Sequence, residues 1–234
     1  MNSLEKYYTE KLYPIQDGVL NIVKKLNTPF YLTGGTALSR GYFHHRYSDD
    51  LDLFVNQCAD FARYVQMLFA ELEARHVSGE FLIDYNRVQK YEHFAQFFIR
   101  KDNVELKIDL VNDTAPHYGD FTDDPVLGAL DGWRNILSNK LAAVFRYEAK
   151  DIVDIWITAK RKAFDWVIFI EEAKTKEAAV DPVVIYNIFK SFPDNLVEVV
   201  KWAMPLDVGE FKNELGQIAD DILKGSNNSL AEQD

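Results

Sequence analysis

The sequence predicts an α/β protein of the α+β kind, in which a mixed sheet with flanking helices is followed by a C-terminal helical bundle domain. In the first half of the chain, short segments alternate apolar and polar residues, as strands with one buried face do. After Trp133, apolar residues recur at three- and four-residue steps almost to the end. We therefore predict an α/β domain over 1–125, a helical domain over 126–225 and a disordered polar tail over 226–234.

The composition supports a globular protein with an ordinary packed core. The chain has 234 residues, of which 47% are hydrophobic, and no segment approaches the roughly 18 to 20 apolar residues that cross a bilayer. A lone cysteine, Cys58, fits a reducing compartment, so we expect a cytoplasmic protein without a membrane partner. The net charge of −11 disfavours binding to nucleic acid over most of the surface. The segment 134–162 differs, with seven basic and three acidic residues, and would be the part to meet a polyanion.

The elements expected in the first half follow from these periodicities. They are, in order, a helix at 4–27 broken near Pro14, a strand at 30–33, a short helix at 36–42, a strand at 50–55, a helix at 59–76, and strands at 80–86, 91–100 and 104–111. In the last strand the even-numbered residues are apolar, whereas Glu105, Lys107 and Asp109 share the other face. This pattern predicts a sheet with one helix-covered face and one polar face.

The second half of the chain is predicted to form a loop followed by helices. The loop is predicted at 112–132, which is rich in turn-forming residues. The predicted helices are 134–147, 151–163, 165–178, 182–191, 195–203 and 207–224.

The chemistry of the sequence is concentrated in Asp50 and Asp52. Residues i and i+2 of a strand point to the same face about 7 Å apart, so both carboxylates could converge on one divalent cation. Asp49 would point to the opposite face or lie just before the strand. The alternative is a strand start whose acids are merely solvated.

Gly34, Gly35 and Thr36 precede this pair and allow two interpretations. The glycines could simply permit a tight turn between a strand and a helix. Alternatively, backbone N–H groups and the Thr36 hydroxyl at a helix start are suited to bind phosphate. The step of 15 residues from Gly35 to Asp50 leaves room for a short helix and a returning strand, which would join both signals in one site.

Two motifs together carry a resemblance to a known family. "GGTAL" followed by "RYSDDLDLF" (46–54), and later "ILSNKLAAVFRYEAKDIVDIW" (136–156), resemble the nucleotidyltransferases of the AbiEii/AbiGii toxin family, within the DNA polymerase β-like superfamily. The resemblance implies metal-assisted transfer of a nucleoside monophosphate from an NTP to an acceptor hydroxyl, with release of pyrophosphate. It also implies the toxin of a bacterial toxin–antitoxin or abortive-infection system, with a cognate antitoxin as partner.

The resemblance also implies roles for particular residues. Gly34, Gly35 and Thr36 would contact the triphosphate, and Asp50 and Asp52 would hold Mg²⁺, with Mn²⁺ as the alternative ion. The superfamily commonly supplies a third carboxylate from a neighbouring strand. Our candidate for this third catalytic and metal-binding residue is Asp109, on the polar face of its strand. The alternative for Asp109 is a solvated residue paired with a nearby lysine.

The helical half contributes further candidates to the site. Lys140 can pack its stem while its ammonium reaches triphosphate oxygens. Asp151 and Asp154 lie at i and i+3 on one helix face and could orient Lys150, Arg146 or an acceptor hydroxyl, or could simply be acids near a helix start.

Arg46 and the two histidines before it are the last residues considered for the site. Arg46, just before the Asp cluster, is placed to pair with an Asp or with a nucleotide phosphate. We interpret His44 and His45 as surface or turn residues, because adjacent side chains on a helix diverge by about 100°.

Three functions remain open on the sequence alone. The first is a Mg²⁺-dependent nucleotidyltransferase that uses an NTP and acts on a hydroxyl of tRNA, another RNA or a protein. The second is a non-catalytic protein that keeps the same fold and binds a nucleotide or a partner protein. The third is a metal-dependent nuclease that uses the same carboxylates.

Overall fold

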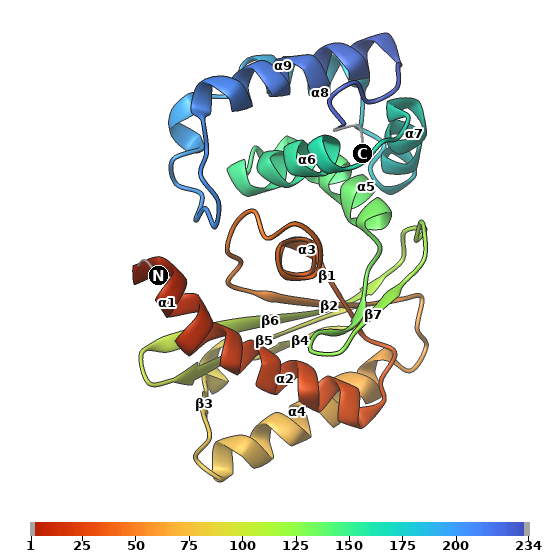
Figure 1. The fold of residues 1–234 in the computed structure, drawn as a ribbon. Coiled ribbons are helices and arrows are strands. Elements are labelled where there is room, and N and C mark those ends of the chain that lie inside the picture. The colour runs from red at the N-terminus through yellow and green to blue at the C-terminus, as the bar shows by residue number, and fades with distance from the viewer. Residues whose placement is uncertain (1–2, 232–234) are drawn as a thin grey trace. The chain divides into compact units, whose positions relative to one another are not determined.

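The computed structural model describes residues 3–231 and divides into two compact units (Figure 1). The first unit comprises the described residues up to Gly41 together with Tyr47–Thr114 and Phe121–Asp131. The second comprises Tyr42–Arg46, Ala115–Asp120 and the described residues from Gly132 onward. Residues 126–131, which the sequence assigned to the helical domain, belong to the first unit.

The first unit contains an eight-stranded mixed sheet in the order β3-β5-β6-β2-β1-β8-β7, with β4 paired to β5. The strands are β1 (Tyr31–Thr33), β2 (Leu51–Asn56), β3 (Leu82–Ile83), β4 (Gln89–Lys90), β5 (Phe94–Lys101), β6 (Val104–Asp113), β7 (Thr122–Asp124) and β8 (Gly128–Leu130). The central pair, β2 and β6, is parallel, and β1 is antiparallel to β2. The predicted α/β fold class is confirmed.

The alternating pattern of β6 gives the sheet one apolar and one polar face. Leu106, Ile108 and Leu110 are fully buried, as are Leu51 and Leu53 on β2. Figure 1 shows helices α2 (Tyr13–Leu26) and α4 (Phe61–Val77) packed on one face of the sheet and α3 (Gly34–Thr36) on the other. The predicted sheet with one helix-covered face is therefore confirmed.

The N-terminal helical segment is interrupted where the sequence predicted. Helix α1 (Ser3–Tyr7) passes into a π-helical turn at Tyr8–Leu12, and α2 begins at Tyr13 with Pro14 in its first turn. Proline is tolerated there because the first N–H groups of a helix have no intrahelical acceptor. Asn27, in the left-handed conformation, ends α2.

Three sequence-based assignments in the sheet and helices are wrong. The predicted loop at 112–132 contains β7 and β8, and Leu130 of β8 pairs with Leu32 of β1. Such three-residue strands carry too little periodicity to be recognised. The predicted strand at 80–86 is reduced to β3, followed by a 3₁₀ turn at Tyr85–Arg87. The predicted helix at 195–203 is only a 3₁₀ turn at Asp194–Leu196.

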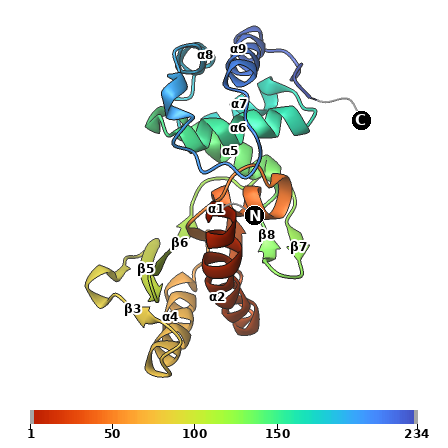
Figure 2. The same cartoon turned by 60° about the vertical axis from the view of Figure 1, so that its left-hand side comes forward.

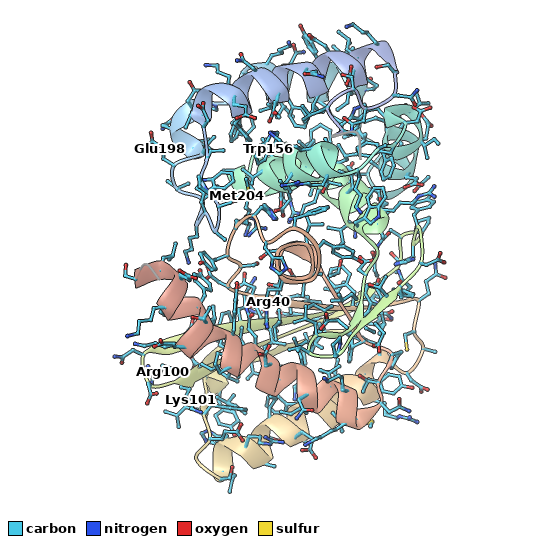
Figure 3. The ribbon with its side chains drawn as sticks, in the orientation of Figure 1. Arg40, Arg100, Lys101, Trp156, Glu198 and Met204 are labelled. Atoms are coloured by element: carbon cyan, nitrogen blue, oxygen red, sulfur yellow. The ribbon has the colours of Figure 1, made fainter. Side chains whose placement is uncertain are left out.

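The second unit is a bundle around a core that includes the fully buried Trp166. Its helices are α5 (Trp133–Ala143), α6 (Ala149–Arg161), α7 (Trp166–Lys176), α8 (Pro182–Lys190) and α9 (Val208–Lys224). Figure 2 shows α8 and α9 from a second direction. Trp156 of α6, labelled in Figure 3, packs edge-on against Phe211 and donates a hydrogen bond to Glu214, which joins α6 to α9.

The described part of the predicted disordered tail is held by hydrogen bonds. Asn228 is buried and donates to the backbone oxygens of Ala159 and Lys162, at 2.6 and 2.7 Å. Ser229 donates to Asp221. Residues 232–234 of that prediction lie outside the described residues. Within the described part of the chain, no helix is long and apolar enough to cross a bilayer.

Candidate active site

The turn that joins β1 to α3 requires glycine at Gly34 for two separate reasons. The φ angle is +67°, in the left-handed region that side chains rarely adopt. In addition, a Cβ placed on Gly34 would overlap Oδ2 of Asp52. The backbone of the turn therefore lies directly against a carboxylate that the sequence placed in the site.

Thr36 is fully buried, and its hydroxyl is used inside the protein. Its Oγ1 donates a 2.5 Å hydrogen bond to the backbone oxygen of Asp50, which ties the glycine turn to the residue before β2. Gly35 is also buried. What the turn offers a phosphate is thus its backbone N–H groups, since the first N–H groups of a helix lack intrahelical partners. A triphosphate contact by the three residues stays a prediction.

The three predicted carboxylates come to one part of the sheet. Asp52 and Asp109 are register partners across the parallel strands β2 and β6. Asp50 lies immediately before β2, and one ammonium group joins it to Asp109: Lys107 Nζ is 3.1 Å from Asp50 Oδ2 and 2.9 Å from Asp109 Oδ2. Asp109 Oδ1 accepts a further hydrogen bond from Gln96 Nε2, at 2.7 Å.

Lys107 is a residue of the site that sequence reasoning named only as a companion of Asp109. Burial lowers the pKa of its ammonium, but the carboxylates of Asp109 and Asp50 outweigh burial and raise it above the ordinary lysine value. Lys107 therefore remains a cation at neutral pH. The signal in the sequence was the K-x-D spacing, because residues two apart on a strand share a face.

The oxygen ligands that these aspartates offer are of the type that a hard divalent cation prefers. Carboxylate oxygens are the ligands that Mg²⁺ prefers, and the shared ammonium shows that Asp50 and Asp109 can reach one positive charge. Within residues 3–231, however, no three His, Cys, Asp or Glu side chains are already gathered as a metal site. Side-chain movement would be needed to bring a third carboxylate onto the same ion.

Asp49 lies before β2 and has a separate set of contacts. Its Oδ1 accepts a hydrogen bond from the Tyr8 hydroxyl, and its backbone oxygen accepts one from Gln16 Nε2. Burial and the hydrogen bond to Asp49 raise the pKa of Tyr8 far above its usual value, so the phenol stays protonated. Asp49 therefore anchors the N-terminal helical segment.

Arg40 is a second residue that the sequence did not single out. It lies in the π-helical turn Ala37–Phe43 that follows α3 (Figure 3). Its guanidinium donates to Asp17 at 2.6 Å and to Gln16 at 3.0 Å, and lies 4.2 Å from the centre of the Tyr13 ring. These contacts fasten the segment after the glycine turn to α2.

A second group of charged residues is buried in the helical unit around Asp154. Arg46 donates two 2.7 Å hydrogen bonds to Asp154, from Nε to Oδ1 and from its terminal nitrogen to Oδ2. Lys140 Nζ lies 2.9 Å from Asp154 Oδ2 and 2.5 Å from Asp151 Oδ1. His45 Nε2 is 2.8 Å from Asp154 Oδ1.

The electrostatics of this group follow from its burial. Burial by itself raises the pKa of Asp154, but Arg46 and Lys140 outweigh it and hold that pKa well below the usual range. For Lys140, burial lowers the pKa, and Asp154 and Asp151 more than reverse the effect. Asp154 is therefore ionised and Lys140 protonated at neutral pH.

The interpretation of His45 as a surface or turn residue is wrong. Its side chain is fully buried, and burial lowers its pKa in spite of the hydrogen bond to Asp154. The imidazole is therefore neutral at pH 7, with Nε2–H donating to the carboxylate and no hydrogen-bond partner for Nδ1. The adjacent His44 has a positive φ of 51° and is exposed, so it matches the prediction.

Arg46 and the Asp151–Asp154 pair have more specific partners than the sequence allowed. Of the two partners considered for Arg46, the structure shows the Asp, and its side chain is 5% exposed. Asp151 and Asp154 both bind Lys140, whereas Arg146 reaches Asp151 only at 4.0 Å. The catalytic and nucleotide-binding roles of these residues stay predictions. The carboxylate group of the sheet belongs to the first compact unit and the Asp154 group to the second.

Two solved structures are similar to the chain in fold. One is a protein from H. pylori provisionally described as a nucleotidyltransferase, with a TM-score of 0.59, 20% identity, and coverage of 92% of this chain and 96% of that chain. The other is JHP933 from Helicobacter pylori, with a TM-score of 0.59, 21% identity, and coverage of 96% and 94%. At this identity the likeness concerns the fold alone.

The family follows from the sequence itself. The profile described as nucleotidyl transferase AbiEii toxin of type IV toxin–antitoxin systems matches residues 21–221, so the chain belongs to that family. The predicted family resemblance is confirmed. No curated protein matches the chain.

Proposed function

We propose that this nucleotidyltransferase is Mg²⁺-dependent and transfers a nucleoside monophosphate from an NTP to an acceptor hydroxyl. The observation that carries the proposal is the placement of Asp50, Asp52 and Asp109 at one part of the sheet, beside a glycine turn that lies against Asp52. Strand carboxylates suit a divalent cation, and backbone N–H groups at a helix start suit the phosphates that such a cation accompanies.

In the proposed site, the aspartates would bind the metal and the glycine turn would bind the triphosphate. Asp50, Asp52 and Asp109 would hold Mg²⁺ or Mn²⁺, and Gln96 would keep Asp109 oriented through its 2.7 Å hydrogen bond. When bound, the metal would neutralise phosphate charge and lower the pKa of the attacking hydroxyl. Gly34, Gly35 and Thr36 would shape the backbone that receives the triphosphate.

Lys140 stays a candidate nucleotide-binding and catalytic residue of the helical unit, with Asp151 and Asp154 as positioning residues. The two carboxylates fix the ammonium from different turns of α6. Arg46 would act by keeping Asp154 ionised and in place, and its phosphate-binding role is the less favoured alternative because its buried guanidinium donates two hydrogen bonds to Asp154.

RNA, including tRNA, is the acceptor class that we propose. The segment 134–162 has a net charge of +4, and Arg146, Lys150 and Arg161 are exposed on it. Part of that charge is compensated, because Arg134 pairs with Glu172 and Lys160 with Glu210 and Glu214. An acceptor would therefore meet the exposed basic residues at the two ends of α6.

Incubating the purified protein with each labelled NTP, Mg²⁺ and total cellular RNA separates the possible functions. Label gained by RNA supports transfer, shortening of RNA supports a nuclease, and neither result supports a non-catalytic binding protein. Asp50→Asn and Asp52→Asn should each abolish labelling while retaining the fold by circular dichroism. Full label transfer by both variants would contradict the site.

The family is described as toxins of type IV toxin–antitoxin systems, which supports a cognate antitoxin as a proposed partner. We propose that toxicity depends on the transferase site. Expression of the wild-type chain should arrest bacterial growth, and expression of Asp50→Asn at equal protein level should not. Growth arrest by both would show that toxicity has another origin.

A further inference from the structure

We propose that Lys107 is an internal counter-cation that holds Asp50 and Asp109 together until a divalent cation displaces it. This inference rests on the proposed metal site and adds a residue that controls it. Lys107 would thereby set the metal concentration at which the site fills.

The ammonium group of Lys107 lies between the two carboxylates. Lys107 Nζ contacts one oxygen of each carboxylate, at 3.1 Å for Asp50 and 2.9 Å for Asp109. The second oxygen of Asp109 is already bonded to Gln96. A cation that used the Asp50 and Asp109 oxygens facing each other would therefore compete with Lys107 for the same two atoms.

This part of the sheet carries concentrated negative charge. Asp50, Asp52 and Asp109 are all acidic, and clustered carboxylates repel one another unless a positive charge lies among them. The Lys107 ammonium brings one positive charge to the two carboxylates that it contacts. A divalent cation balances them better and binds carboxylate oxygen as its preferred ligand.

The Lys107 side chain can leave this position without disturbing the fold. Its side chain is 30% exposed, so a path to solvent is open, and its position in β6 is set by backbone pairing with β5. The lysine ammonium is a compact charge on a long flexible side chain, whereas the arginine guanidinium is planar and binds carboxylates in a fixed geometry. The ion pairs that it would give up are partly exposed, which limits their strength.

Metal binding without nucleotide tests the inference directly. Mn²⁺ affinity, measured by electron paramagnetic resonance, should be tighter in Lys107→Met than in the wild type. A partly exposed ion pair changes an equilibrium by up to about fivefold, so the loss of two pairs should tighten binding by about 3- to 25-fold.

Two control variants isolate the effect of position from that of charge. Lys101→Met removes the same charge from the exposed end of β5, where Lys101 is labelled in Figure 3, and should leave the affinity within about twofold of the wild type. Lys107→Arg keeps a cation that can bind both carboxylates and should not tighten metal binding.

A second measurement follows the lysine in the wild-type protein, so that it does not depend on a variant folding. Reductive methylation read by mass spectrometry should modify Lys107 more slowly than Lys101 without metal. Saturating Mg²⁺ should accelerate modification of Lys107 and leave that of Lys101 unchanged.

The outcomes separate this inference from the proposed function. Unchanged or weaker Mn²⁺ affinity in Lys107→Met, with normal binding by the wild type, would overturn the role of Lys107 and leave the metal site intact. Methylation of Lys107 that does not respond to saturating Mg²⁺ would also overturn it. Failure of both the wild type and Lys107→Met to bind Mn²⁺ would refute the metal site and the inference together.

Discussion

Replacing Gly34 by alanine should damage the site through one identifiable contact. A side chain at φ of +67° is strained by about 1 to 2 kcal/mol, and the added Cβ would also overlap Asp52 Oδ2. Relieving that overlap requires movement of the carboxylate or of the backbone, which costs about a further 1 to 3 kcal/mol. We therefore expect the free energy of unfolding to fall by about 2 to 5 kcal/mol.

Two other glycines provide matched controls that separate the backbone strain at Gly34 from the overlap with Asp52. Gly79 has a φ of +80° but no atom within 4 Å of its would-be Cβ, so Gly79→Ala should show the backbone strain alone. Gly18, inside α2, has neither strain nor contact, and Gly18→Ala should stabilise the protein by about 0.5 to 1 kcal/mol through helix propensity. The excess cost of Gly34→Ala over Gly79→Ala measures the contact with Asp52.

Urea denaturation and label transfer are the assays for this prediction. In an Asp52→Ala background the overlap disappears, so Gly34→Ala should there cost no more than Gly79→Ala. NTP label transfer by Gly34→Ala should fall by about 100-fold, because misplacing a catalytic group by about 1 Å has that effect. An equal cost for Gly34→Ala with and without Asp52 would refute the reasoning.

The remaining predictions concern the helical unit. Asp154→Ala should lower the free energy of unfolding by about 3 to 5 kcal/mol in urea, because it leaves the buried charges of Arg46 and Lys140 without their shared partner; a loss under 1 kcal/mol would contradict this. Burial lowers the pKa of His45 in the folded protein, so below about pH 6.5 the imidazole is protonated in the unfolded chain but not in the folded one. The free energy of unfolding should therefore be highest above that pH. On acidification it should fall by at most about 1.4 kcal/mol per pH unit. His45→Gln should flatten this dependence between pH 7 and 5, and an unchanged slope would count against a neutral buried imidazole. Asn228→Ala should cost about 1 to 3 kcal/mol by leaving two backbone oxygens near the end of α6 without their donor, and a stability equal to the wild type would show that the segment after α9 contributes nothing.

The fold was predictable where the pattern within one element is strong. The alternation in β6 correctly identified a buried face and a polar face, and the spacing after Trp133 correctly identified five helices of the bundle among the described residues. β8 was missed because it exists through its pairing with β1, and a strand of three residues has no periodicity of its own. The helix expected at 195–203 failed because local spacing cannot show that a segment will pack as a turn.

By itself, the sequence determined the family, the fold class and the kinds of side chain in the site. The motifs around Gly34, Asp50 and Lys140 were sufficient for this because glycine turns, i and i+2 carboxylates and helical spacing are local properties. Only the tertiary structure decided which distant charges meet: Arg46 with Asp154, and Lys107 with Asp50. These pairs join residues far apart in the chain or on neighbouring strands, and their geometry depends on sheet register and helix packing, which no local pattern specifies.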